Sequence, residues 1–239
     1  MAKKEFPDQQ DKQVSKGKEK SIENEGGSLF GDFSSKISGL SSKIFGIIKF
    51  ILAIIILPLV YSSVVSFINE FTQIDKGFQQ VFYNGIISFL AIHLFIWEPA
   101  VIYNKGHKLL EIMFSFFKPM VNVAPFLLPI YTILIFILYG LLALGINSEG
   151  VLEYTLFLIG FSSILHLTFA AKTIRSKKGD FLKANYIFGF SFIFILNLAL
   201  LALGFSLIFK EFSFVNFCNI SFTIFQNIFL AVFKQLFVF

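Results

Sequence analysis

The chain has 239 residues, of which 56% are hydrophobic, 18% aromatic and 15% charged, and its formal net charge is +5. Soluble domains carry about 25% charged residues, so this composition, with its long uncharged runs, excludes an ordinary soluble domain and indicates an all-α polytopic membrane protein. The basic residues lie in particular connections rather than in one patch, which argues against a nucleic-acid partner. A single cysteine, Cys218, excludes an intrachain disulfide and any CxxC metal or redox site.

The amino-terminal part of the chain is predicted to lie outside the hydrocarbon. Residues 1–27 are polar, with lysines and acids that nearly cancel, so we expect a disordered cytoplasmic tail or, alternatively, a docking segment for a partner. In residues 28–48, apolar side chains recur every three or four positions opposite serines and lysines, which predicts an amphipathic interfacial helix. Its serine-rich polar face also fits a helix that senses bilayer curvature.

Residues 44–239 are predicted to form a transmembrane helical bundle. About 20 apolar residues cross the hydrocarbon core, because a helix rises about 1.5 Å per residue and the core is about 30 Å thick. Five runs meet this requirement, at about 44–68, 81–102, 119–146, 151–171 and 184–209. The 35 phenylalanines are interpreted as filler that faces lipid.

Three further segments depart from a plain apolar span. Residues 104–118 are too short and too charged to cross, so we expect an amphipathic helix that lies flat on the membrane. Pro119, Pro125 and Pro129 predict an irregular start to the third span, whose freed carbonyls must be satisfied by neighbouring helices or water. Residues 212–233 form an interfacial helix or, as we favour, a sixth span whose polar stripe is turned into the bundle, the stripe being Asn216, Asn219, Thr223, Gln226 and Asn227.

The distribution of lysine and arginine predicts the orientation, since these residues concentrate in cytoplasmic connections. Eight lysines precede residue 44, three lie in 98–118, and four lysines and one arginine lie in 172–183, whereas the opposite connections contain only Lys76 and Lys210. We therefore expect a cytoplasmic N-terminus. The low content of cysteine and the short loops favour a cell membrane, namely the inner membrane of a bacterium. The basic cluster in 172–183 is the expected contact for anionic lipid or a partner, through Lys172, Arg175, Lys177, Lys178 and Lys183.

Polar residues inside the apolar spans are the candidate functional groups. His93 and His166 lie at similar predicted depths in the second and fourth spans, with Glu98 near the first of them, which suits a proton relay or a two-histidine metal site. The alternative is that a neutral histidine, like Asn197 in the fifth span, hydrogen-bonds to neighbouring helices. Two histidines without a third close ligand are a weak metal signal, so no metal and no cofactor is expected.

The chain contains no HExxH, GxxxxGK[ST] or GxSxG motif, so nothing in the sequence supports catalysis. We expect a non-catalytic integral membrane protein that acts as a scaffold, anchor or assembly subunit of a membrane complex. Its expected partners are the lipid bilayer and other membrane subunits. A small permease or channel that uses His93 and His166 is the alternative, and a membrane enzyme that acts on lipid is a second alternative.

Overall fold

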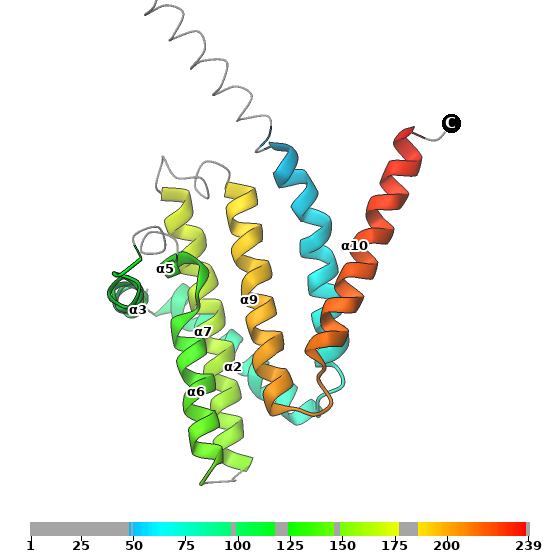
Figure 1. The fold of residues 1–239 in the computed structure, drawn as a ribbon. Helices are drawn as coiled ribbons and strands as arrows, with labels where there is room; N and C mark the ends of the chain where they lie inside the picture. The colour runs from blue at the N-terminus through cyan, green and yellow to red at the C-terminus, as the bar shows by residue number, and fades with distance from the viewer. Residues whose placement is uncertain are drawn as a thin grey trace, which may run out of the picture. The chain divides into compact units, whose positions relative to one another are not determined.

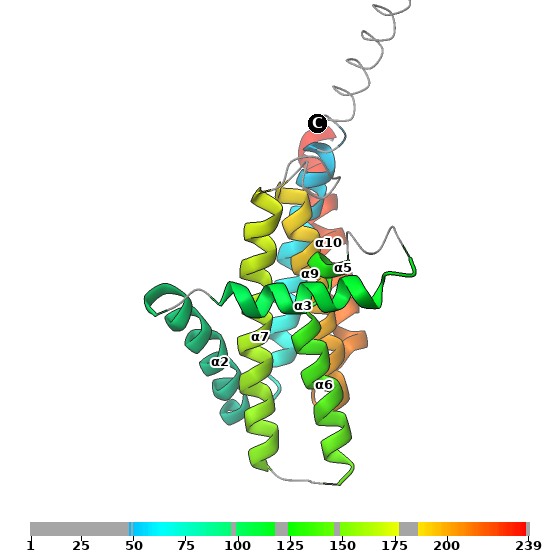
Figure 2. The ribbon, with the colours of Figure 1, turned by 90° about the vertical axis from the view of Figure 1, so that its left-hand side faces the viewer.

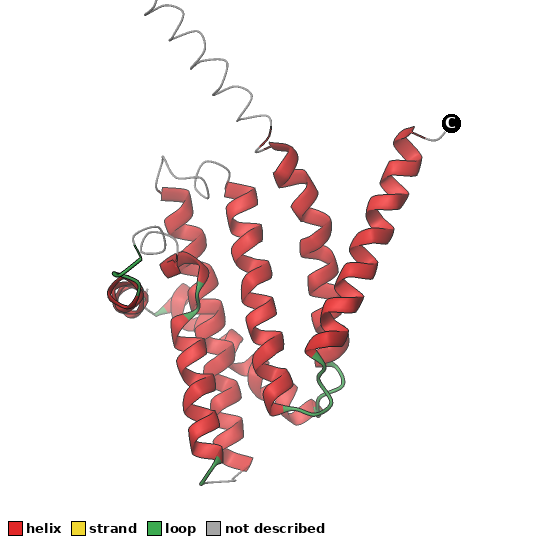
Figure 3. Cartoon of the chain, viewed as in Figure 1, coloured by secondary structure: helices red, strands yellow, loops and turns green. Residues whose placement is uncertain are grey.

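The computed structural model describes residues 48, 50–96, 99–117, 124–145, 149–176 and 186–237. It divides the chain into two units, Met1–Phe50 and Ile51–Phe239, and the following description concerns the second unit. The predicted tail of residues 1–27 lies outside the described residues, and so does the predicted interfacial helix of residues 28–48 apart from Ile48. Every regular element in the described ranges is a helix (Figure 3), which confirms the predicted all-α transmembrane bundle.

Five of the described helices are long and apolar enough to cross a membrane, so the protein is membrane-embedded. These are the helix Phe50–Phe71, α2 (Lys76–Phe95), α7 (Glu149–Ser176), α9 (Tyr186–Ile208) and α10 (Phe214–Phe237). Three shorter helices lie between α2 and α7 in the chain, namely α3 (Ala100–Met113), α5 (Ala124–Leu127) and α6 (Ile130–Ala143).

The long helices run back and forth between two ends of the bundle (Figure 1). The connections 72–75 and 209–213 lie at one end together with the end of α6, and we call this the turn end. The end of α7, the start of α9 and the C-terminal end of α10 lie at the opposite end.

Phenylalanine builds much of the core near the turn end. Phe67 and Phe71 stack with ring centroids 5.7 Å apart, and both rings contact Phe205 of α9, at 6.0 and 5.5 Å. Phe82 of α2 and Phe217 of α10 join the same buried cluster. Lipid-facing filler is therefore the wrong interpretation for this group, because these rings are held against one another, and such pairs add about 0.5–1.5 kcal/mol beyond their burial.

Among the helices α2 to α10, the most extensive helix–helix contact joins α2 to α7, and two glycines make it close. A Cβ atom on Gly85 would lie 2.1 Å from the carbonyl oxygen of Phe157, and one on Gly160 would lie 2.2 Å from the carbonyl oxygen of Phe82. Any side chain larger than hydrogen would therefore collide with the backbone of the other helix. Small residues of this kind let membrane helices gain van der Waals contact that lipid cannot replace.

α3 runs across the bundle rather than along it (Figure 2). Its residues Tyr103, Gly106 and Leu110 are buried, while most of its remaining side chains are exposed. The predicted second span, 81–102, was wrong at its C-terminal end, because the spanning helix ends at Phe95 and α3 starts directly after Pro99. A proline inside a helix removes one backbone hydrogen bond, so this is where the chain changes direction.

The predicted third span, 119–146, is not one continuous helix. α5 ends at Leu127, Leu128 and Pro129 are not helical, and α6 has only 14 residues. At about 1.5 Å per residue α6 is about 21 Å long, which is less than the hydrocarbon thickness. Within the described residues the break agrees with the predicted irregular start, since Pro129 has no amide with which to continue the helix.

α10 is attached to the bundle by its first turns. The carboxylate of Glu70, which is 3% exposed, accepts hydrogen bonds from the backbone N–H of Ser213 at 2.9 Å and from the side-chain amide of Asn216. The hydroxyl of Ser66 donates to the carbonyl of Phe217 at 2.6 Å. A carboxylate is favourable at this position because a helix N-terminus carries partial positive charge.

Beyond Asn216, whose amide bonds to Glu70, the polar stripe of α10 faces away from the bundle, so the prediction that it turns inward was wrong for the rest of the stripe. All five of its members are exposed, namely Asn216, Asn219, Thr223, Gln226 and Asn227. The face that packs on the other helices carries the buried Phe217 and Ser221 instead. After Ser221, the described side chains of α10 are half-buried or exposed.

Candidate functional site

The break between α5 and α6 is held by polar side chains from two spanning helices. Where a helix is interrupted, carbonyls that would accept bonds along the helix need other donors. Nε2 of His166 lies 3.1 Å from the carbonyl oxygen of Phe126 in α5. The side-chain amide of Asn197 donates to its own helix at Ile193, at 2.8 Å, and reaches the carbonyl of Leu127 at 3.5 Å. Two adjacent carbonyls of α5 are therefore bound from α7 and α9.

Hydroxyl groups secure the first turn of α6 on the other side of the break. The Thr132 hydroxyl lies 2.8 Å from that of Ser162 and 3.3 Å from that of Ser163, and all three residues are buried. The Tyr131 hydroxyl donates to the carbonyl of Ile102 in α3 at 2.6 Å. These bonds tie α6 to α7 and to α3, so the irregular segment is fixed from three directions.

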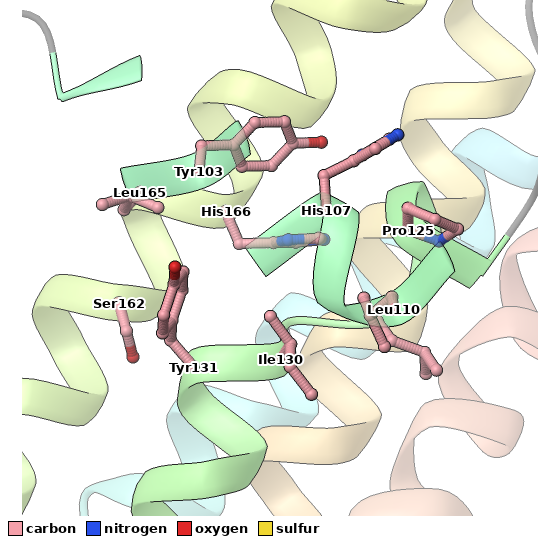
Figure 4. Close-up of a pocket in the computed structure, with 10 residues that line it drawn as sticks. Tyr103, His107, Leu110, Pro125, Ile130, Tyr131, Ser162, Leu165 and His166 are labelled. Carbon is pink, nitrogen blue, oxygen red and sulfur yellow. The ribbon is translucent and has the colours of Figure 1, made fainter. Parts of the chain in front are cut away.

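A small cavity lies where α3, α5, α6 and α7 meet (Figure 4). Its lining includes Tyr103 and His107 from α3, Tyr131 from α6, and Ser162 and His166 from α7. The volume open to the centre of a water molecule is about 10 Å³, which is room for roughly one water. Ligand pockets for small molecules are about 300–1,000 Å³, so this cavity suits a bound water better than a substrate.

Aromatic and imidazole rings surround this cavity. Tyr103 has its ring centroid 5.9 Å from that of His107 and 6.0 Å from that of His166. Nε2 of His107 lies 3.4 Å from a carboxylate oxygen of Glu111 one turn along α3. For His166 to donate to the Phe126 carbonyl, the neutral ring must carry its proton on Nε2.

Burial raises the pKa of Tyr103 to about 12, against a smaller opposing effect of the Thr173 hydroxyl. Among the described residues the Tyr103 hydroxyl makes no hydrogen bond of normal geometry. The phenol is therefore kept neutral at the edge of the cavity. Its hydroxyl can therefore donate a hydrogen bond to a water in the cavity or accept one from it.

The structure does not bring His93 and His166 into direct contact. The ring of His93 stacks on Phe89 with centroids 5.6 Å apart and meets Phe169 edge-on at 5.7 Å. Phe169 in turn stacks on Tyr103 at 5.4 Å, so two aromatic rings lie between the histidines. Within the described residues, Nδ1 of His93 is buried and has no hydrogen-bond partner.

Most of the other predicted functional residues lie beyond what the structure describes. Glu98, Lys177, Lys178 and Lys183 are outside the described residues, as is the side chain of Arg175. Lys172 lies on α7 with its side chain exposed. Its placement four residues before the end of α7 is compatible with an interfacial contact.

Reasoning from the sequence missed His107. One ring, that of Tyr103, contacts both His107 and His166, whereas two rings connect His93 to His166. One signal was present, since His107 and Glu111 are four residues apart on a helix predicted to be amphipathic. Tyr103 was missed because it stands just beyond the span predicted for 81–102, where an aromatic residue is ordinary. Across the described residues, no group of three or more His, Cys, Asp or Glu side chains could hold a metal ion.

Comparisons with protein-family models, with curated proteins and with solved structures found no match for this chain.

Proposed function

We propose that the protein is a non-catalytic integral membrane protein that scaffolds, anchors or helps to assemble a membrane complex. The observation that carries this proposal is that polar groups inside the bundle join helices to one another. His166 and Asn197 bind the carbonyls of the broken third span, and Thr132 binds Ser162 and Ser163. A subunit that positions partners needs a rigid membrane part, and these bonds stiffen its irregular segment.

We infer further that the N-terminus is cytoplasmic and that the membrane is a cell membrane, the inner membrane of a bacterium. The lysine-bearing connections support this orientation, because insertion leaves them on the cytoplasmic side. The exposed Lys172 supports a contact of the basic cluster with anionic lipid, at about 1 kcal/mol for each charge near the surface.

Purification of the tagged protein from its native membranes in mild detergent tests the assembly role. We expect another membrane protein to co-purify at constant stoichiometry. Deletion of residues 1–27 should abolish the cellular phenotype if the tail recruits the partner. The variants His93→Ala and His166→Gln should retain the phenotype, because glutamine keeps a side-chain N–H for the Phe126 carbonyl. Solute flux through the purified protein alone would contradict a purely structural role.

A small permease or channel is the second candidate, and one observation favours it. His107, His166 and Tyr103 converge on a cavity with room for one water, and imidazole–water chains can pass protons. Liposomes that enclose a pH-sensitive dye test this role. Proton flux above that of empty liposomes, lost in His107→Phe and in His166→Phe but kept in His93→Phe, would support a relay at this cavity. Flux equal to that of empty liposomes would rule it out.

A further inference from the structure

Beyond Asn216, which bonds to Glu70, the polar stripe of α10 makes no side-chain hydrogen bond to another helix of the described chain. The side chains of Asn219, Gln226 and Asn227 are exposed and make no hydrogen bond to any described residue. Only 11% of the most apolar stretch of α10 is buried inside the bundle, compared with 56% of the corresponding stretch of α7. Beyond its first turns, α10 therefore exposes most of its surface to whatever surrounds the bundle.

Lipid is a poor environment for this stripe. α10 starts beside the helix Phe50–Phe71 and leans away from it toward its C-terminal end (Figure 1), and it is long and apolar enough to cross a membrane. Gln226 is 12 residues from Phe214, which is about 18 Å along the axis and near the middle of the hydrocarbon. A glutamine side chain is too short to reach either interface from there, so its amide needs a protein partner.

The chemistry of the stripe matches a second copy of the same chain. Copies inserted with the same orientation can pair about an axis along the membrane normal, and each residue then meets its equivalent at the same depth. Asn219 and Gln226 carry amides that both donate and accept, so identical faces satisfy one another. The stripe carries no charge, so identical faces do not repel. Thr223 lies between them and is small enough for two backbones to approach.

We propose that α10 is the interface of a parallel homodimer, in which Asn219, Thr223 and Gln226 of one protomer face the same three residues of its partner. This inference extends the proposed assembly role by naming the partner. It is tested on purified protein, so its failure leaves the co-purification of other subunits as an independent question.

Cross-linking of full-length protein in phospholipid vesicles tests the proposed face. The natural chain has one cysteine, Cys218, which is exposed on α10. It lies five residues from Thr223, about 140° around the helix. The variant Thr223→Cys in a Cys218→Ser background should form a disulfide-linked dimer at least fivefold more efficiently than the natural Cys218 under the same mild oxidation.

Energy transfer between labelled copies, measured as the protein is diluted with lipid, gives the strength of the dimer. The double variant Asn219→Leu, Gln226→Leu should raise the dissociation constant about tenfold, because each interhelical amide bond in a membrane contributes modestly. Asn84→Leu is the matched control. It removes an exposed amide from α2, which bonds only to Gln80 of its own helix, and should leave the dimer unchanged.

Several results would overturn the inference. One is that Thr223→Cys cross-links no more efficiently than the natural Cys218. Another is that the double variant leaves the dissociation constant unchanged, and a third is that the protein stays monomeric at every lipid dilution. Cross-linking of Thr223→Cys to a different protein in native membranes, without homodimer in vesicles, would also overturn it, because the stripe would then serve another subunit.

Discussion

The glycine contact between α2 and α7 gives the sharpest prediction about stability. A Cβ atom on Gly160 would lie 2.2 Å from the carbonyl oxygen of Phe82, whereas ordinary van der Waals contact begins at 3.4 Å. Relief of the clash in Gly160→Ala requires a local separation of 3.4 − 2.2 = 1.2 Å between two helix backbones. A backbone carbonyl cannot rotate aside as a side chain can, so the whole contact must open.

Because the collision is with backbone atoms, the cost of that opening lies at the upper end of the range for overpacking, about 2–3 kcal/mol. Alanine is favoured over glycine within a helix by about 0.8–1.0 kcal/mol, which offsets part of this loss. We therefore expect Gly160→Ala to lower the free energy of unfolding by about 1–2 kcal/mol. Gly85→Ala should behave alike, because its Cβ would lie 2.1 Å from the carbonyl oxygen of Phe157.

Gly140→Ala is the matched control, since a Cβ atom on Gly140 meets nothing within 4 Å. It should raise the free energy of unfolding by about 0.5–1 kcal/mol through helix propensity alone. Unfolding in mixed micelles titrated with a denaturing detergent, followed by circular dichroism, measures all three variants. The reasoning is refuted if Gly160→Ala is as stable as the natural protein or if Gly140→Ala is destabilised to the same extent.

Three further predictions follow from the polar contacts. Asn197→Leu removes the donor to two carbonyls and should lower the free energy of unfolding by about 1–2 kcal/mol in the same titration. His166→Gln should lower the free energy of unfolding less than His166→Leu does, because glutamine keeps an N–H for the Phe126 carbonyl. Glu70→Ala should destabilise α10 by about 1–3 kcal/mol, because it leaves the backbone N–H of Ser213 without its acceptor. Amide hydrogen exchange in the first turn of α10 should then become faster, and unchanged exchange would contradict the capping role of Glu70. The pKa of Tyr103 is about 12 in the folded protein and about 10 in the unfolded chain, so its contribution to the free energy of unfolding is complete below pH 10. That contribution, about 2–3 kcal/mol, is lost as the pH rises through about 12, and Tyr103→Phe should remove this pH dependence. An equal loss of stability at high pH in Tyr103→Phe would assign the effect to other groups.

The roles of the interior polar residues follow from where the chain breaks. Histidine and asparagine are costly in lipid, and in this bundle both are placed where the break between α5 and α6 leaves the carbonyls of Phe126 and Leu127 without helical donors. The same two side chains would be destabilising in a bundle whose third span were continuous. Their placement therefore couples the irregular segment to the packing of α7 and α9.

Much of the fold was decided by local composition. A run of about 20 apolar residues can satisfy its backbone in lipid only as a helix, so the spans near 151–171 and 184–209 were predictable to within a few residues. The irregular start of the third span was also predictable, because proline lacks an amide whatever its surroundings. The distribution of lysines predicts which connections lie in the cytoplasm, and that orientation stays a prediction.

Contacts between distant residues were decided only by the tertiary structure. Gly85 and Gly160 look like ordinary glycines until α2 and α7 meet, and His107 acquires its relation to His166 only because α3 crosses the bundle. The direction of the α10 stripe could not be derived from its spacing, because a helical period shows that Asn219 and Gln226 share a face but not which neighbour covers it. Sequence determines which residues share a face of each helix, and packing determines what that face meets.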